Sequence, residues 1–348
     1  MNKLKGQGAV SNIHNRFSAS RYEATLYQDD YEEEKAQTKN LEVSPKTIVN
    51  KIKGNSLPFS YSMNPYQGCE HGCAYCYARP THQYWGYSAG IDFERIILVK
   101  QNAPELLEKF FQKKGYQPSP IMLSGNTDCY QPIERQYQLT RKLLQVCLDY
   151  RHPVSIITKN ALVLRDLDIL KALAEKNLVS VSLSIPTINE NLRRLMEPRT
   201  SSTNNKLKAI KELSSAGVPV HVMIAPIIPS LNSNEIFEIV KTIHEHGAVS
   251  FGYTLVALND ETQPVFESWL ETHFPERKNK VINQIASLHG GKMSEKNIAK
   301  RDQGEGNFAE MIHRTFQIAK LKYFPKKSHF QLSTSLFDGT KGEKLRLF

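Results

Sequence analysis

Five short apolar runs, rich in valine and isoleucine, recur along the middle of the chain. They occupy residues 119–124, 153–158, 178–184, 218–225 and 248–256. Each run has the length of a strand, and a nearly continuous apolar composition is typical of strands that are buried on both faces of a sheet. The pattern therefore predicts a set of buried parallel strands.

Residues with helical periodicity lie between these runs. Apolar positions recur at helical spacing over 139–150, 207–213 and 236–243. The second and third of these segments stop just before Gly217 and Gly247, and glycine commonly follows the last turn of a helix. Strands that alternate with helices predict a parallel sheet, and a further strand is expected just before residue 69, which makes six.

The chain is expected to divide into four segments. Residues 1–45 are polar, with an acidic cluster at 29–34, and are predicted to be a mobile arm. Residues 46–260 carry the strand–helix alternation. Apolar periodicity after that point predicts a helical extension over 261–335, and a polar tail follows at 336–348.

Composition excludes some classes of protein. The 348 residues are 40% hydrophobic and 23% charged, which is ordinary for a globular protein. The chain has no apolar run of about 18 residues that would predict a membrane helix, and its first residues lack the apolar core of a signal peptide. The expected location is the cytoplasm. The net charge of +10 permits a polyanionic partner such as nucleic acid, although a solvated basic surface has the same charge.

Three cysteines with short spacing carry the strongest chemical signal. Cys69, Cys73 and Cys76 are spaced C-x3-C-x2-C, and the aromatic residue Tyr75 precedes the last one. Three thiolates make a soft, incomplete metal site. A [4Fe–4S] cluster normally takes four cysteines, so three leave one iron open to a small chelating ligand.

A zinc site is the alternative interpretation of these cysteines. Three cysteines and one histidine also bind zinc, and His71 or His82 would supply the fourth ligand. Zinc sites more often show paired C-x2-C spacing, so the iron–sulfur interpretation is favoured.

The cysteine motif resembles that of the radical S-adenosylmethionine (SAM) superfamily. Its flank at 64–72, Asn-Pro-Tyr-Gln-Gly-Cys-Glu-His-Gly, is similar to the branch that contains spore photoproduct lyase and "DNA repair photolyase"-like proteins. The resemblance implies a partial (β/α)6 TIM-like barrel that holds one [4Fe–4S] cluster and SAM. It also implies reductive cleavage of SAM to a 5′-deoxyadenosyl radical, with electrons from a donor such as flavodoxin or ferredoxin.

Radical chemistry is then expected at the carboxyl ends of the barrel strands. Gly125, Asn126 and Thr127 follow the 119–124 run, and the resemblance implies that this loop binds the amino group of SAM. Thr158 and Lys159 end the next run and match a Thr-Lys pair that serves the cofactor in spore photoproduct lyase. The lysine would pair with the methionyl carboxylate. An ordinary polar turn and a solvent-facing lysine are the alternatives.

Further candidates for cofactor binding lie on the next strands. Ser182 and Ser184 alternate with apolar residues, so both face one side of their strand. Ala225 ends the following strand, where a small side chain would admit the adenosyl group. Tyr75 of the cysteine motif is also counted among the cofactor-binding candidates.

Two cysteines lie outside the motif. Cys129 follows the Asn-Thr-Asp loop and is the candidate catalytic residue, because a thiol near a substrate radical donates a hydrogen atom. Spore photoproduct lyase places its donor cysteine before the comparable pair, where this chain has Gly125 and Asn126, so a buried thiol is the alternative. Cys147 lies on the apolar stripe of a predicted helix and is expected in the core.

The favoured interpretation is a radical SAM enzyme that acts on nucleic acid, in repair or modification. Modification of a protein or small molecule is one alternative, and a non-catalytic iron–sulfur or zinc module is another. The last five residues, Lys-Leu-Arg-Leu-Phe at 344–348, resemble the Gln-Leu-x-Leu-Phe peptide that binds the bacterial sliding clamp. A tail that folds back on its own barrel is the alternative there. No membrane partner is expected.

Overall fold

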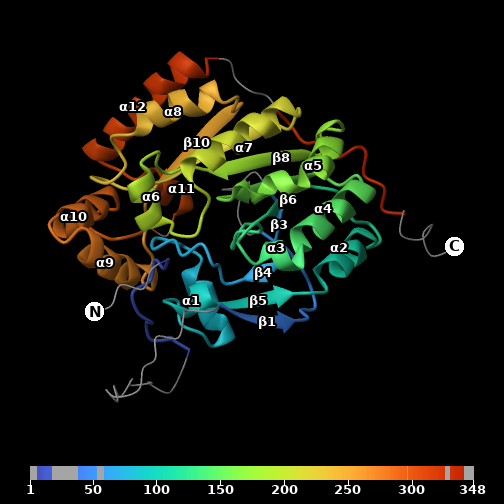
Figure 1. The fold of residues 1–348 in the computed structure, drawn as a ribbon, viewed down its shortest axis with the longest axis horizontal. Coiled ribbons are helices and arrows are strands. Elements are labelled where there is room, and N and C mark those ends of the chain that lie inside the picture. The colour runs from blue at the N-terminus through green and yellow to red at the C-terminus, as the bar shows by residue number, and fades with distance from the viewer. Residues whose placement is uncertain (1–5, 18–37, 53–58, 296, 326–329, 341–348) are drawn as a thin grey trace.

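A computed structural model describes residues 6–17, 38–52, 59–295, 297–325 and 330–340. Its main sheet has seven strands in the order β10-β9-β8-β7-β6-β3-β2. The first six of these are parallel neighbours, and β2 is antiparallel to β3. Because β10 and β2 are the two edges, the barrel is partial (Figure 1). The strands are β2 (Val49–Lys51), β3 (Tyr61–Met63), β6 (Ile121–Leu123), β7 (Val154–Thr158), β8 (Val179–Ser184), β9 (Val220–Ile227) and β10 (Ser250–Leu255).

The helices that follow these strands are α2 (Ala103–Phe111), α3 (Glu134–Tyr137), α4 (Leu139–Asp149), the 3-10 helix η2 (Ala161–Asp166), α5 (Leu167–Ala174), α6 (Glu190–Met196), α7 (Thr203–Ser215) and α8 (Ile236–Glu245). Most of them cover the outer face of the sheet, whereas α6 packs beside the loop that carries Cys73. On β8, Val179, Val181 and Leu183 are buried in the core shared with these helices. The alternating serines of β8 face the inside of the barrel, as the period of two requires.

The predicted (β/α)6 architecture is confirmed. Strands β6 to β10 fall on the five apolar runs, and β3 is the expected sixth strand. The helices α7 and α8 end just before Gly217 and Gly247, whose φ angles are +79° and +95°. A side chain is rarely tolerated in that left-handed conformation, which explains why glycine marks both ends.

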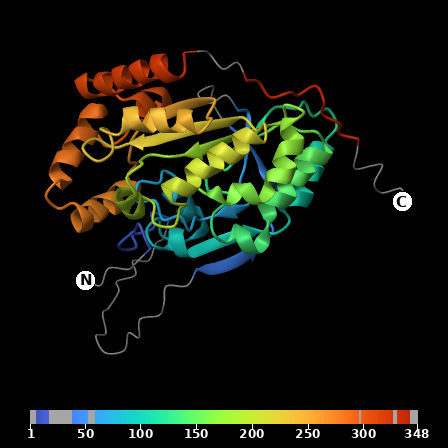
Figure 2. The same cartoon turned by 45° about the horizontal axis from the view of Figure 1, so that its top comes forward.

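The amino-terminal segment differs from the predicted mobile arm. Strand β1 (Lys39–Val43) pairs with β5 (Ile96–Lys100), which also pairs with β4 (Tyr66–Gln67), and the three form a second sheet. Most side chains of β1 are exposed, so backbone pairing rather than burial holds the strand. Figure 2 shows this small sheet at the lower margin of the molecule, near α1 (Asp92–Arg95).

The carboxyl-terminal extension is helical, with α9 (Thr262–His273), α10 (Lys278–Leu288), α11 (Ile298–Gln303) and α12 (Asn307–Tyr323). Helix α12 lies along α8 at the edge of the barrel (Figures 1 and 2). Its Phe316 stacks on Tyr253 of β10, with ring centroids 3.7 Å apart. Helices α9 and α10 instead pack against α6 and the cysteine loop, through Phe266, Trp269 and Ile285.

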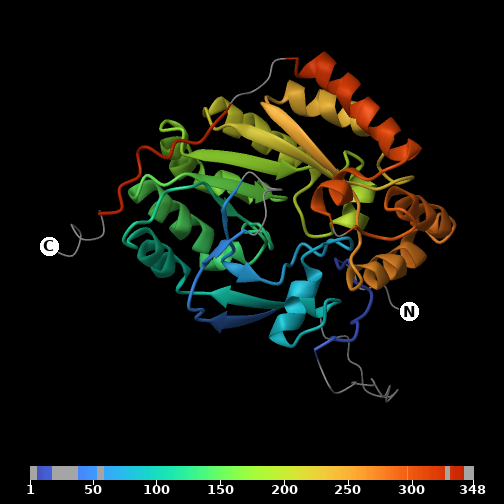
Figure 3. The same cartoon turned by 180° about the vertical axis from the view of Figure 1, so that it is seen from behind.

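Residues 330–340 run along the amino-terminal edge of the strands (Figure 3). The Ser333 amide donates to the Asn177 carbonyl (2.8 Å), just before β8. The Asp338 amide donates to the Tyr150 carbonyl (3.0 Å), before β7. The segment is therefore fixed to the end of the barrel opposite the carboxyl ends of the strands. The 344–348 peptide lies outside the described residues.

Candidate functional site

Arg79 fixes the shape of the loop that carries the cysteines. It begins the 3-10 helix η1 (Arg79–Trp85), and its side chain is fully buried. The guanidinium donates to the Cys73 carbonyl from Nε (3.1 Å) and Nη2 (2.8 Å), and to the carbonyls of Ala89 and Gly90. It also forms an ion pair with buried Glu94. These bonds satisfy all five N–H donors of the guanidinium, so the loop has one well-defined path.

The amino-terminal segment closes over this loop from outside. Glu94 accepts hydrogen bonds from the backbone amides of Gly8 (3.0 Å) and Ala9 (2.8 Å). A Cβ atom at Gly8 would lie 1.7 Å from the Gly72 carbonyl oxygen, so only glycine permits this approach. Residues 6–17 are thus part of the site rather than a free arm.

The three cysteines are free thiols in a mostly buried setting. Cys69 and Cys73 are buried and Cys76 is partly exposed. Burial raises the pKa of Cys76 to about 11 and that of Cys73 well above its usual range. Thiolates at these positions therefore require positive charge beside them, which a metal centre and nearby cations supply. The donor set fits an iron–sulfur cluster.

The two histidines of the zinc alternative have different surroundings. His82 is buried between the rings of Tyr87 and Phe93, with centroids at 5.2 and 5.6 Å. Burial lowers the pKa of His82 to about 4. His71 contacts both Cys69 and Asp128.

Asp128 links the cysteine loop to the end of β7. Nδ1 of buried His71 lies 3.3 Å from Asp128 Oδ2. Burial alone would lower the pKa of His71, but the Asp128 carboxylate and Cys69 raise it to about 10. The same carboxylate accepts bonds from the Thr158 hydroxyl (2.7 Å) and the Lys159 amide (2.7 Å). Asp128 was not predicted as a site residue.

The loop after β6 lies against the cysteine loop. Asn64 Oδ1 accepts bonds from the amides of Asn126 (2.8 Å) and Thr127 (3.2 Å). The Tyr77 hydroxyl, one residue after the last cysteine, donates to the Gly125 carbonyl (2.7 Å). The Asn126 and Thr127 side chains also bond to protein groups, so in this structure they join the two loops.

Lys159 follows β7 and enters a buried ionic network. Its Nζ lies 2.9 Å from Glu197 Oε1 and 5.8 Å from the centroid of the Tyr75 ring. Glu197 is fully buried, accepts a hydrogen bond from the Tyr75 hydroxyl and pairs with buried Lys206 at 3.0 Å. Burial alone would raise the pKa of Glu197, but Lys159 and Lys206 hold it below its usual range. Burial lowers the pKa of Lys206, which Glu197 opposes, and with both lysines protonated the network carries one excess positive charge.

The remaining cofactor candidates lie at neighbouring strand ends. Ser184 is the last residue of β8, beside Met223 of β9, and Ser182 lies opposite Ile157 of β7. Ser182 and Ala225 are partly exposed, whereas Ser184 is buried. All three therefore lie toward the carboxyl ends of neighbouring strands, on the same side of the barrel as Lys159.

Cys129 differs from its expected position. Its side chain is fully buried in the core between the sheet and helices. Its amide donates to the Ser124 hydroxyl (2.7 Å), and its carbonyl accepts from the Thr140 hydroxyl (2.6 Å). Because the preceding Asp128 turns toward Lys159, the next side chain turns into the core. Burial raises the pKa of the Cys129 thiol, as it does that of Cys147, which is in the core as predicted.

Arg79, Glu94 and Lys206 were not among the residues predicted from the sequence. Each carries a buried charge. Its ion-pair partner is distant in the sequence or does not belong to a periodic pattern. Only Arg79 had a signal in the sequence, because it lies three residues after the last cysteine of the motif.

Comparison with known proteins places the chain in a family. The model of the radical SAM superfamily matches residues 63–262. An uncharacterized protein of Mycobacterium tuberculosis is 33% identical over 238 residues, which cover 68% of this chain and 70% of the relative. An uncharacterized protein of Methanocaldococcus jannaschii is 32% identical over 247 residues, which cover 71% and 88%.

Solved structures share the fold. Spore photoproduct lyase in complex with dinucleoside spore photoproduct aligns with a TM-score of 0.58 and 16% identity. The alignment covers 84% of this chain and 81% of that one. Another structure of that lyase contains AdoMet. No helix in the described ranges is long and apolar enough to cross a bilayer.

The matched region contains the cysteine loop, the strand ends and the Lys159 network. The family implies an iron–sulfur cluster and SAM, and its members are enzymes. The chain belongs to the radical SAM superfamily.

Proposed function

We propose that this enzyme binds one [4Fe–4S] cluster through Cys69, Cys73 and Cys76 and acts on nucleic acid, in repair or modification. The bound cofactors supply reductive cleavage of a carbon–sulfur bond and hydrogen abstraction from carbon. The chain supplies a fixed loop for the thiolates and shields two of them from solvent. Modification of a protein or small molecule is the alternative outcome of the tests below.

Lys159 and the loop after β6 would hold SAM. The Lys159 side chain is 20% exposed, and its ammonium is the cation that a methionyl carboxylate would meet at the end of β7. Glu197 orients this lysine, and the second cation Lys206 keeps the network net positive. A carboxylate entering the site therefore meets a charge that Glu197 alone does not cancel.

One observation favours a nucleic-acid substrate: aromatic side chains are exposed around the cysteine loop. Tyr77 is 61% exposed, Tyr84 69% and Trp85 44%. The Phe17 and Tyr84 rings pack together with a tilt of 32°. The Arg16 guanidinium lies 4.8 Å from the Phe17 ring and pairs with Glu261 at 2.6 Å. Exposed aromatic rings beside a cation are the surface on which bases stack. The fold shared with spore photoproduct lyase supports the same proposal.

Three partner and location proposals accompany this function. Cluster reduction needs a small electron-transfer protein such as flavodoxin or ferredoxin, and the cytoplasm is the compartment we propose. We also propose that residues 344–348 bind the sliding clamp.

Anaerobic reconstitution with iron, sulfide, SAM and dithionite tests the enzyme. We expect about four irons per chain and release of 5′-deoxyadenosine. Cys73→Ala should lose the cluster, whereas Cys147→Ala, which changes only the core, should keep it. Full iron content and cofactor cleavage in Cys73→Ala would refute the assignment.

Mass spectrometry of nucleic acid from cells with and without the gene tests the substrate. A nucleoside that changes with the gene, and again when Cys73→Ala replaces the normal enzyme, would support the proposal. Unchanged nucleosides together with a changed protein or metabolite would favour the alternative.

A further inference from the structure

A cavity of about 780 Å³ opens between the loops that follow β8 and β9 and the start of α10. It is separate from the cysteine loop, and nothing described above uses it. Its lining is mostly polar and contains two cations. The lining residues are Ile188, Asn189, Ser230, Leu231, Ser233, Asn234, Glu235, Arg277 and Lys280.

Buried hydrogen bonds hold one wall of this cavity in place. Asn232 is fully buried, and its side-chain amide donates to the carbonyls of Pro186 (2.7 Å) and Pro226 (2.9 Å). Its Oδ1 accepts from the Ile228 amide (2.6 Å). One side chain thus ties the loop after β8 to the loop after β9. The wall is formed before any ligand arrives, which lowers the cost of binding.

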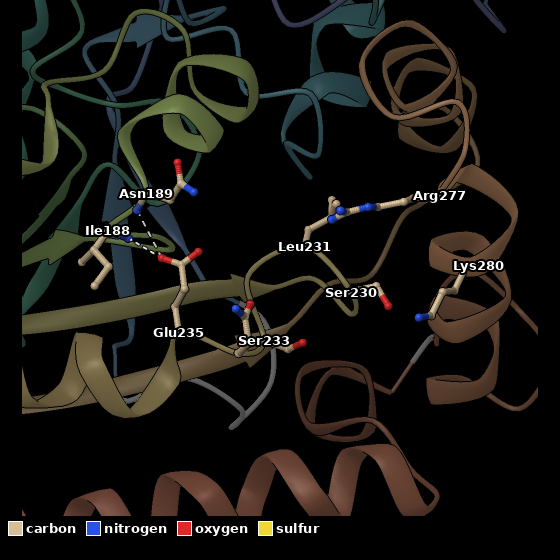
Figure 4. Close-up of a pocket in the computed structure, with 9 residues that line it drawn as sticks. Ile188, Asn189, Ser230, Leu231, Ser233, Glu235, Arg277 and Lys280 are labelled. Atoms are coloured by element: carbon tan, nitrogen blue, oxygen red, sulfur yellow. Dashed lines mark hydrogen bonds between the residues drawn. The ribbon is translucent and has the colours of Figure 1, made fainter.

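The one acidic group in the lining is engaged with the protein. Glu235 accepts bonds from the Thr187 hydroxyl (2.8 Å) and from the amides of Ile188 (2.8 Å) and Asn189 (3.2 Å). Figure 4 shows its carboxylate turned toward Ile188 and Asn189. These donors stabilise Glu235 as a carboxylate, and it forms no ion pair with Arg277 or Lys280 in the described structure.

The cations lie on the opposite wall. Figure 4 shows the Arg277 and Lys280 side chains extending from the α10 side toward the loop that carries Ser230 and Leu231. Arg277 is exposed, and its only ion pair with a described residue is a long 3.8 Å contact to Glu276. Lys280 forms no ion pair with any residue that the structure describes. By contrast, Lys278 between them pairs with Glu271 at 2.8 Å.

The cavity lies close to the barrel mouth across the sheet. Lys159 follows β7, Asn189 follows the neighbouring β8, and Ser230 follows β9. Asn189 and Ser230 come five and three residues after their strands end, so both loops emerge at the carboxyl ends of the strands, as Lys159 does. A polymer bound at the mouth would therefore lie on the same side of the barrel as the cavity.

We propose that this cavity holds a phosphate group, with part of its nucleoside, of a nucleic-acid strand whose reacting part lies at the barrel mouth. The inference rests on the proposed nucleic-acid function. Arg277 and Lys280 pair with the phosphate, because phosphate oxygens form their strongest hydrogen bonds with cationic side chains. Ser233 and Asn234 offer hydrogen bonds, and Leu231 offers an apolar surface to the sugar or base. The cavity is larger than a phosphate alone needs.

Binding of a fluorescein-labelled 20-nucleotide single strand, measured by anisotropy at several salt concentrations, tests the proposal. The variant is Arg277→Glu with Lys280→Glu in the full chain. Affinity should fall at least about tenfold, and the slope of log K against log salt should decrease by about one to two. The control, Lys171→Glu with Lys211→Glu, makes the same charge change on exposed positions of α5 and α7 and should lose less than about twofold.

The outcomes separate the cavity from the proposed function. If the normal protein binds the strand and the double variant binds it equally well, the cavity proposal is overturned while the nucleic-acid function stands. If the normal protein does not bind the strand, adenosine 5′-monophosphate is titrated by NMR. Binding that the double variant loses assigns the cavity to free nucleotides and overturns the strand proposal. Binding of neither probe overturns both the cavity and the nucleic-acid function.

Discussion

The cysteine loop and the cavity beside α10 both contain arginine, but the charges are used differently. At the loop, Arg79 and Glu94 of α1 are fully buried and bonded to one another. At the cavity, Arg277 and Lys280 are exposed, Arg277 has one long ion pair, and Lys280 has none with a described residue. Buried charges must be matched inside the protein because water does not reach them, so they determine shape. Exposed charges contribute little to the fold and stay available to a ligand.

The largest effect should come from breaking the buried pair. Arg79→Leu leaves Glu94 buried without its cation and removes the donors to the Cys73 carbonyl. The free energy of unfolding should fall by about 3–5 kcal/mol, measured by urea denaturation of the metal-free protein. The comparison would fail if Arg79→Leu were as stable as Arg277→Leu.

Removal of the cation at the end of β7 should have the next largest effect, on cofactor binding. Lys159→Ala loses one charge-assisted hydrogen bond, worth about 1.5–3 kcal/mol, so SAM affinity should fall about ten- to a hundredfold. Titration of SAM against the EPR signal of the reduced cluster measures it, with Lys211→Ala as control. An unchanged affinity would show that Lys159 does not contact the cofactor.

A smaller effect should depend on pH. Burial lowers the pKa of Lys100 to about 8, and its ammonium donates to the Asn64 carbonyl at 2.9 Å. The unfolded pKa is about 10.4, so between pH 8 and 10 the unfolded chain binds more protons and stability rises with pH. This rise, about 1–2 kcal/mol, should disappear in Lys100→Met but not in Lys171→Met. Urea denaturation at pH 7.5 and 9.5 measures the rise. The prediction would be wrong if the free energy of unfolding rose equally in the normal chain and in Lys100→Met.

The smallest effect should be on the stability of the cavity variants. Arg277→Ala and Lys280→Ala remove exposed cations, so each should change the free energy of unfolding by less than about 0.5 kcal/mol. A loss above about 2 kcal/mol would show that these cations support the fold and would remove the contrast with Arg79.

The barrel was predictable because its signals are local. Valine and isoleucine runs mark strands buried on both faces, and Gly217 and Gly247 mark helix ends. Strand β1 carried no such signal, because its side chains are mostly exposed and backbone pairing with β5 holds it. Residues 6–17 were missed for the same reason, since Gly8 and Ala9 bind through their amides.

Site residues were predictable only where a local signal in the sequence marks them. The cysteines have a fixed spacing, and Lys159 directly follows a predicted strand. The network of Lys206 and Glu197 depends on how α6 and α7 pack, which no local pattern reports. Cys129 was misplaced because its orientation depends on the bonds that its neighbour Asp128 makes to Thr158 and Lys159.

The anchored segment 330–340 sets a limit on reach for the end of the chain. Asp338 is bonded beside Tyr150, at the face of the barrel away from the cysteine loop. Lys344 follows Thr340 by four residues, which span at most about 14 Å when fully extended. If residues 344–348 bind the sliding clamp as proposed, the clamp would be tethered on the side of the barrel opposite the cysteine loop, and the mouth would remain open to a nucleic-acid substrate.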